Sequence, residues 1–118
     1  MIQQPWPRAS IKENHMQINV SGKHLEVTDP IKTHATERAE RLPRLFDRIQ
    51  EINILIDKSD NHQHEEVEVI VEVEKSSPFI TKKSGPDLYV LIDDVFGKIE
   101  RQLRDHKEKL RNRKHQVN

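Results

Sequence analysis

The sequence contains no cysteine, few aromatic residues and no long hydrophobic run. The absence of cysteine excludes a disulfide scaffold, a thiolate zinc site and a cysteine nucleophile. No apolar stretch approaches the ~18 residues of a membrane span, and the N-terminus lacks the apolar core of a signal peptide; we therefore expect a cytoplasmic protein with no membrane partner. Hydrophobic residues form only 33% of the 118-residue chain, so the expected core is thin.

Motifs of catalysis and metal binding are also missing. The chain has no glycine-rich phosphate loop and no nucleophile elbow. Asp93 and Asp94 lie ~100° apart on a predicted helix, with no matching base nearby in sequence. His62 and His64 lack a third ligand and are more typical of a solvated turn. We therefore expect that the protein is not an enzyme and that it binds no cofactor, no metal ion and no small-molecule substrate.

Four segments alternate apolar and polar residues, a pattern that predicts four strands. They cover residues 16–20, 52–57, 66–74 and 79–83, and Pro78 favours a sheet edge for the last. Gly22 and Lys23 are expected to end the first strand. Ser59-Asp60-Asn61 is typical of a turn between the second and third.

Two segments carry apolar residues at three- and four-residue spacing, which predicts two helices. The first begins at Thr28-Asp29-Pro30 and extends to about residue 48, with Pro43 kinking or tightening its last turn. Ser84-Gly85-Pro86-Asp87 is expected to open the second, which extends to about residue 112. The order β-α-β-β-β-α makes the first two strands parallel and the later hairpins antiparallel. We expect an α+β fold, a four-stranded mixed sheet with both helices on one face.

The predicted domain covers residues 16–112. Residues 1–15 carry two prolines around Trp6 and show no sustained apolar period, so we expect a disordered extension, or a start of translation at Met16. Residues 113–118 are expected to form a basic flexible tail.

The net charge of zero argues at first against a nucleic-acid ligand, because nucleic-acid-binding domains are often strongly basic. The charges are unevenly placed, however. Residues 51–75 hold eight acids and two bases, a net of −6, whereas residues 98–118 hold eight bases and three acids, a net of +5. The zero total therefore hides an acidic hairpin and a basic helix end.

Arginines on both predicted helices form stripes that lie away from the apolar sides. These stripes consist of Arg41, Arg44 and Arg48 on the first helix and Arg101, Arg104 and Arg111 on the second. Because the planar guanidinium matches phosphate oxygens, two stripes on one side of the molecule indicate a surface for a polyanion. With few aromatics, contact with the backbone of folded RNA is favoured over base stacking. The alternative is that these charges only keep the helices soluble, paired with glutamates.

The second helix carries a recognisable motif. Asp87-Leu88-Tyr89-Val90-Leu91-Ile92-Asp93, with Lys98-Ile99-Glu100-Arg101-Gln102-Leu103 and His106-Lys107, resembles the D-x-Y-x-x-I-D…K-(L/I)-x-R-Q-L-x-x-H-K signature of the ribosome hibernation promoting factor family, which includes the ribosome-associated inhibitor protein Y. In the first half, Met16-Gln17-Ile18-Asn19-Val20-Ser21-Gly22, Val27-Thr28 and Leu45-Phe46-Asp47-Arg48-Ile49 agree with its pattern. The resemblance covers about residues 16–111.

This resemblance implies a fold close to double-stranded-RNA-binding domains and a role as a translation inhibitor. Such proteins bind rRNA in the decoding channel of the small ribosomal subunit during starvation or stationary phase. They block the messenger and tRNA sites and promote ribosome hibernation. The lack of a second domain and the short tail favour the short type, which pairs ribosomes only alongside a separate ribosome modulation factor.

The candidate rRNA-binding residues have two sources. The resemblance implies contact by Lys98, Arg101, His106 and Lys107, with Asp87, Tyr89 and Asp93 at the helix start. The charge argument alone adds Lys23, Arg41, Arg44, Arg104, Lys109 and Arg111. For His106 and Tyr89, a packing role on the apolar side of the helix is an equal alternative.

Two other functions remain open at this point. One is a general structured-RNA-binding module that acts outside the ribosome. The other is a protein-interaction module, including a homodimer, that uses the acidic sheet face or the edge of the fourth strand.

Overall fold

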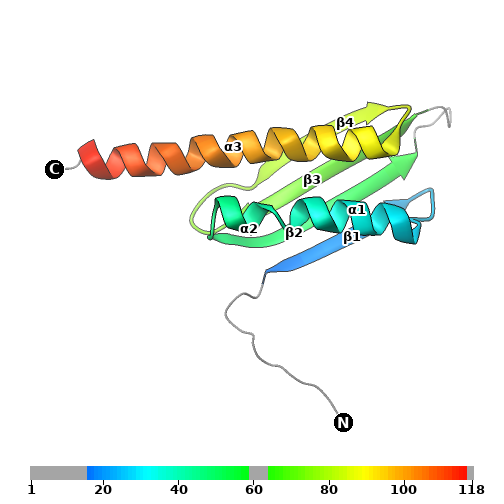
Figure 1. Cartoon of the computed structure of the whole chain (residues 1–118), viewed down its shortest axis with the longest axis horizontal. Helices are drawn as coiled ribbons and strands as arrows, with labels where there is room; N and C mark the ends of the chain where they lie inside the picture. Colours follow the sequence, from blue (N-terminus) through cyan, green and yellow to red (C-terminus); the bar gives the residue numbers. More distant parts are fainter. Residues whose placement is uncertain (1–15, 59–63, 117–118) are drawn as a thin grey trace, which may run out of the picture.

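The computed structural model describes residues 16–58 and 64–116, with side chains up to residue 113. The elements follow one another as β1 (Gln17–Lys23), α1 (Asp29–Ala39), α2 (Leu42–Leu45), β2 (Ile49–Lys58), β3 (Glu65–Val73), β4 (Phe79–Gly85) and α3 (Leu88–Gln116) (Figure 1). The strand order is β1-β2-β3-β4, with β1 and β2 parallel and the other pairs antiparallel. The expected four-stranded mixed sheet is confirmed.

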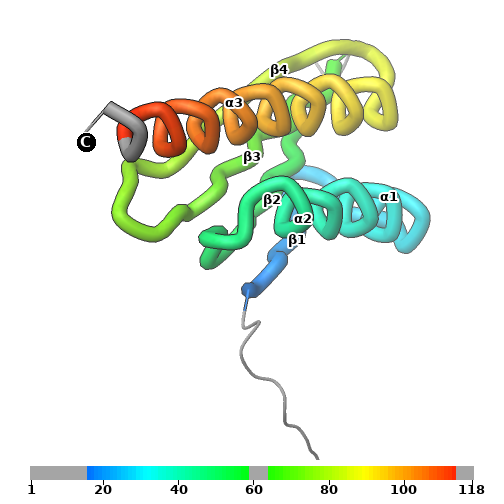
Figure 2. Tube along the Cα trace, turned by 60° about the vertical axis from the view of Figure 1, so that its left-hand side comes forward, coloured from blue at the N-terminus to red at the C-terminus, as the bar shows by residue number. Residues whose placement is uncertain are grey.

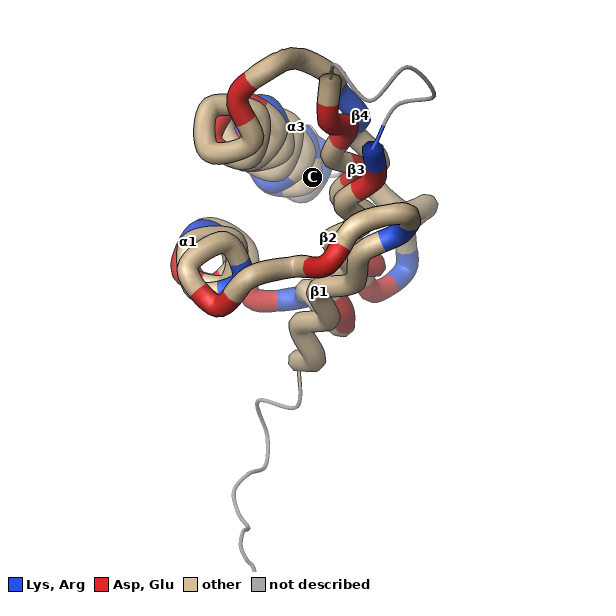
Figure 3. Tube along the Cα trace, turned by 90° about the vertical axis from the view of Figure 1, so that its right-hand side faces the viewer, with Lys and Arg blue, Asp and Glu red and all other residues tan. Residues whose placement is uncertain are grey.

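The helices cover one face of this sheet, and the other face is open to solvent (Figure 3). Ile54 of β2 pairs with Val69 of β3, Ile56 pairs with Val67, and all four side chains are fully buried toward the helices. The alternate residues of these strands point outward and are largely acidic. The period-2 pattern thus places an apolar layer under the helices and an acidic surface opposite them.

Helix α3 supplies the other half of the core. Ile92, Phe96, Ile99 and Leu103 recur at three- and four-residue spacing and are fully buried against the sheet. Asp87 caps the helix, since its carboxylate accepts hydrogen bonds from the backbone N–H groups of Tyr89 and Val90 at 3.1 and 3.3 Å.

The expectation that the first helix extends to about residue 48 is wrong for the segment after Ala39. Helix α1 ends at Ala39, and a separate turn, α2, begins at Leu42. Pro43 explains the break, because it has no N–H to donate to Ala39 and its ring would crowd that carbonyl. Arg48 and Ile49 therefore leave the helix, and Ile49 starts β2 three residues earlier than expected.

Other boundaries also differ from the expectation. Gly22 and Lys23 continue β1 instead of ending it, paired with Ile56 and Asp57. Gly22 is required there, because a Cβ would lie 2.7 Å from the Leu25 carbonyl oxygen and 2.8 Å from the Val27 side chain. β4 extends to Gly85, and α3 continues to Gln116, so residues 113–116 are helical. The expectations for residues 1–15 and for the turn at 59–61, and the position of His62, fall outside the described residues.

Candidate nucleic-acid interface

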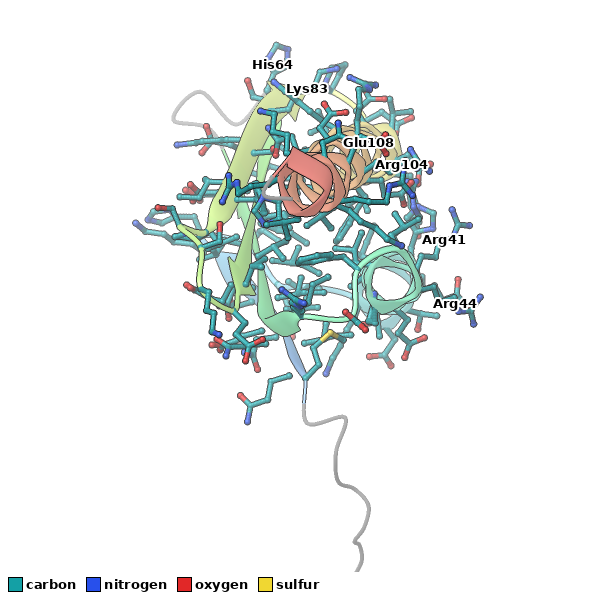
Figure 4. The ribbon with its side chains drawn as sticks, turned by 90° about the vertical axis from the view of Figure 1, so that its left-hand side faces the viewer. Arg41, Arg44, His64, Lys83, Arg104 and Glu108 are labelled. Atoms are coloured by element: carbon teal, nitrogen blue, oxygen red, sulfur yellow. The ribbon has the colours of Figure 1, made fainter. Side chains whose placement is uncertain are left out.

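Helices α1 and α3 run in the same direction, so α2 and the C-terminal half of α3 lie at the same end of the sheet (Figure 1). We define the basic cluster as six exposed residues in or next to these two segments: Arg41, Arg44, Arg101, Arg104, Lys107 and Arg111. Arg41, Arg44 and Arg104 project from the side of the helices away from the sheet (Figure 4). The structure therefore brings the two arginine-bearing segments onto one surface, although α1 ends before Arg41.

Most of the basic cluster has no acidic partner. Within the described part of the chain, Arg111 is its sole member in an ion pair, at 2.5 Å from Glu108. The alternative in which the arginines are neutralised by neighbouring glutamates therefore does not hold for the other four arginines of the cluster. Free guanidinium groups on one surface can each form two parallel hydrogen bonds with a phosphate.

The last turn of α1 is tied to the N-terminal half of α3 by a residue that the sequence did not single out. Arg38 of α1 donates hydrogen bonds to Asp93 at 2.6 Å and to Glu100 at 3.3 Å, both on α3. Its guanidinium lies 6.0 Å from the ring centroid of Phe96. Ala35 and Ala39 beside it are fully buried. Arg38 stands between these two small residues, which allow α3 to pack closely against α1. An arginine in such a position is the signal that could have indicated a contact with the neighbouring helix.

His34 and Tyr89 complete this contact between the helices. His34 Nε2 lies 2.9 Å from Asp93, and its ring meets the Tyr89 ring edge-on at 5.2 Å. Tyr89 is nevertheless 44% exposed, so its outer side remains available to a ligand. Asp93 serves as an anchor for two residues of α1, and this packing role accounts for its place at the start of α3.

Asp93 has a lowered pKa, and this makes the helix contact sensitive to acid. Burial raises the pKa, but hydrogen bonds from Arg38 and His34 outweigh it. A carboxyl whose pKa is lower in the folded state stabilises the protein above its unfolded pKa of about 4 and loses that contribution as the pH falls through the folded value. We expect Asp93→Asn to reduce the loss of thermal stability between pH 6 and about pH 3.

The measurement is the unfolding midpoint at each pH, followed by circular dichroism. Asp105→Asn is the matched control, because Asp105 is exposed on the same helix, and it should leave the acid sensitivity of the wild type unchanged. An Asp93→Asn variant that loses as much stability in acid as the wild type would contradict this assignment.

His106 and Asp87 have structural roles. The His106 ring packs edge-on against Phe46 at 5.4 Å and Phe79 at 5.3 Å, which ties the C-terminal half of α3 to the sheet and to the segment after α2. Asp87 is the N-cap of α3. Its negative charge also makes direct contact with a phosphate unfavourable.

Lys23 is not brought to the basic cluster. It lies at the end of β1 opposite Asp57 and lines a depression on the outer sheet face together with Glu66 and Glu68. The pKa of Asp57 is lowered, first by its hydrogen bond with His24 and more weakly by the charge of Lys23. Lys23 therefore faces an acidic surface on the far side of the sheet.

Lys98 and Lys109 are exposed on α3, but on a different side of the helix from Arg104. At ~100° per residue they lie roughly 120–140° from Arg104, with Arg101 between them and Arg104. A ligand that contacts both lysines and Arg104 must therefore cover the whole outer half of the helix.

The described residues contain no group of three or more His, Cys, Asp or Glu placed to hold a metal ion. Among those residues, no helix is long and apolar enough to cross a bilayer.

Comparison with known proteins gives consistent matches over most of the chain. Relatives named ribosome hibernation promoting factor are 34% identical in Azotobacter vinelandii, covering 80% of this chain and 85% of that protein, and 32% identical in Pseudomonas putida, covering 80% and 89%. The Escherichia coli protein of that name is 28% identical, covering 81% and 98%. These matches confirm the resemblance found in the sequence.

Solved structures share the fold. A ribosomal subunit interface protein from Coxiella burnetii superposes with a TM-score of 0.70 at 20% identity, covering 78% of this chain and 98% of that one. The N-terminal domain of Thermus thermophilus Protein Y gives 0.64 at 21% identity, covering 80% and 99%. The model of the Sigma 54 modulation protein / S30EA ribosomal protein family matches residues 18–111, and the chain belongs to this family.

Proposed function

We propose that this protein is a non-enzymatic ribosome hibernation factor that binds rRNA in the decoding channel of the small subunit under stress or in stationary phase. There it blocks the messenger and tRNA sites and inhibits translation. The observation that carries the proposal is the basic cluster, in which Arg41, Arg44, Arg101, Arg104 and Lys107 have no ion-pair partner among the described residues. The names of the family relatives supply the ribosome as the target.

The distribution of charge supports one orientation of binding. The helix side presents the basic cluster, whereas the outer sheet face carries Glu66, Glu68 and Glu72 of β3. A molecule with such a dipole is steered toward a polyanion with its basic side first. The acidic sheet face then points away from the rRNA and is free for contact with a further protein, such as a separate ribosome modulation factor.

Salt dependence tests whether phosphate contacts dominate. Each phosphate neutralised on a duplex-like target contributes a slope of about −0.9 in log affinity against log salt. Five unpaired cations therefore predict a steep fall, by roughly 4.5 log units per decade of salt. The measurement is co-sedimentation of the protein with purified small subunits at increasing potassium chloride. An affinity that stays flat with salt would contradict a phosphate-dominated interface.

A general structured-RNA module is the second candidate, favoured by the exposed guanidinium and ammonium groups of the basic cluster. Such side chains contact phosphates without selecting a sequence. Competition separates the two functions. A decoding-channel factor should be displaced from small subunits by messenger and tRNA, whereas a general binder should be displaced equally well by free RNA duplex.

A further inference from the structure

A cavity of about 660 Å³ opens beside the basic cluster, between α2 with the turn that follows it and the last turns of α3. Figure 2 shows these two segments on the same side of the sheet. The apolar wall of the cavity consists of Pro43, Leu45, Phe46 and Leu110. A concave apolar site of this volume is in the range of small-ligand pockets.

The wall of this cavity is firmly supported. Phe46 is only 5% exposed and its ring is held by His106, which in turn contacts Phe79. Leu45 and Leu110 are partly buried and pack against the core. The cavity is therefore part of the packed fold, and the two leucines offer it a partly open apolar surface.

The rim of the cavity is strongly basic. Arg44, Arg48, Lys107, Arg111 and Arg113 line it, and Asp47 is the one acidic residue there, which gives a net charge of +4. Within the described residues, only Arg111 of these five is ion-paired. An occupant should therefore combine a flat or apolar part with negative charge.

We infer that this cavity accepts one unpaired nucleotide, with its base against Leu45 and Leu110 and its phosphate held by the rim. Arg44, Lys107 and Arg111 belong both to the rim and to the basic cluster, so an RNA backbone that follows the cluster passes the mouth of the cavity. Arginine planes stack on extruded bases, and single-stranded bulges are where RNA exposes them. The inference rests on the proposed function, because it takes its RNA ligand from there.

The test uses an RNA hairpin with a single-nucleotide bulge containing 2-aminopurine and a fully paired hairpin of the same length. The wild-type protein should bind the bulged hairpin about tenfold more tightly, and the fluorescence of the probe should change as the base enters the apolar cavity. Filling the cavity with Leu110→Trp should abolish this preference and leave the affinity for the paired hairpin unchanged. Leu55→Trp is the matched control, because Leu55 is 37% exposed on the outer sheet face, and it should keep the preference.

A second variant guards against misfolding of Leu110→Trp. Arg48 is exposed and lies in the turn before β2, so Arg48→Glu should fold normally and still lower the preference for the bulge. Competition with excess AMP shows whether the nucleotide in the cavity must belong to an RNA. If AMP reverses the fluorescence change of the bulged hairpin, the cavity also takes free nucleotides. Equal binding of both hairpins, or of neither, would overturn the inference, and so would a Leu110-dependent preference for an acidic, leucine-containing peptide over RNA.

The two proposals fail in different ways. If the wild type co-sediments with small subunits but shows no preference for the bulge, the cavity inference is wrong and the proposed function stands. If the wild type does not co-sediment with small subunits, the proposed function itself is wrong.

Discussion

Reversing the charge of Arg101 and Arg104 together should lower the affinity for small ribosomal subunits by about 100-fold or more. Both residues are exposed on α3, and neither is ion-paired within the described part of the chain. Each hydrogen bond to a charged group contributes about 1.5–3 kcal/mol, so the loss of two already gives a decrease of this size. The introduced glutamates add repulsion from the phosphates. The measurement is co-sedimentation of Arg101→Glu/Arg104→Glu with purified subunits.

The fold should not change, because both side chains point into solvent, and the far-UV circular dichroism spectrum should match that of the wild type. Lys82→Glu is a control on the opposite face: Lys82 is exposed on β4 and lies 3.6 Å from Glu66. It should leave ribosome binding within about twofold of the wild type. If the double variant still co-sediments with subunits at wild-type affinity, the basic cluster is not the ribosome-binding surface.

Arg38→Ala should destabilise the fold by about 3 kcal/mol, which lowers the unfolding midpoint by more than about 10 °C in a domain of this size. The side chains of Arg38 and Glu100 are only 13% and 14% exposed. Removal of the arginine would therefore leave a nearly buried carboxylate without its partner. The bond to Asp93 contributes less, since that carboxylate is 48% exposed and screened by water.

Two variants separate this ion pair from a general effect of losing an arginine. Arg101→Ala removes an exposed arginine from the other helix and should change stability by no more than about 0.5 kcal/mol. Arg38→Ala/Glu100→Gln should recover part of the lost stability, because a neutral amide costs less to bury than a charge. An Arg38→Ala variant as stable as the wild type would show that the ion pair does not hold the helices together.

Arg38 also tests how much the basic cluster depends on the packing of the helices. Its guanidinium binds Asp93 and Glu100 and no side chain of the basic cluster, so it is a positioning residue. At a temperature where the Arg38→Ala variant is still folded, its affinity for subunits should fall less than that of Arg101→Glu/Arg104→Glu. Its dependence on salt should stay close to that of the wild type, because the number of phosphate contacts is unchanged.

The elements that the sequence predicted well are those in which one physical rule dominates. Val67, Val69 and Val71 alternate with glutamates, and such a segment can bury its apolar side only as a strand. The core-facing residues of α3, from Ile92 to Leu103, follow helical spacing just as directly. The break after Ala39 was missed because the apolar spacing continues through Pro43, although the backbone hydrogen bonds cannot.

The residues of the candidate site likewise divide into those that the sequence placed correctly and those that it did not. The outward direction of Arg101 and Arg104 follows from helical spacing alone, and both side chains are exposed in the structure. Lys23 was not placed correctly because the first strand was expected to end at Gly22 and Lys23. Since β1 continues through Lys23, its alternation with Ile18 and Val20 puts Lys23 on the outer sheet face. The packing of His106 between Phe46 and Phe79 could not be predicted either, since the three rings come from distant parts of the chain.

By itself, the sequence determined the α+β topology, the acidic and basic segments and the family of this protein, because local periodicity and motif spacing are written along the chain. Only the tertiary structure decided which charges are free. Arg38 is neutralised by Asp93 and Glu100, which lie 55 and 62 positions further along the chain. Arg41 and Arg104, in contrast, have no ion-pair partner among the described residues. The cavity beside the basic cluster likewise exists only once α2 and α3 meet. Ion pairing and concavity depend on distances in space, and these are fixed by how the helices pack on the sheet.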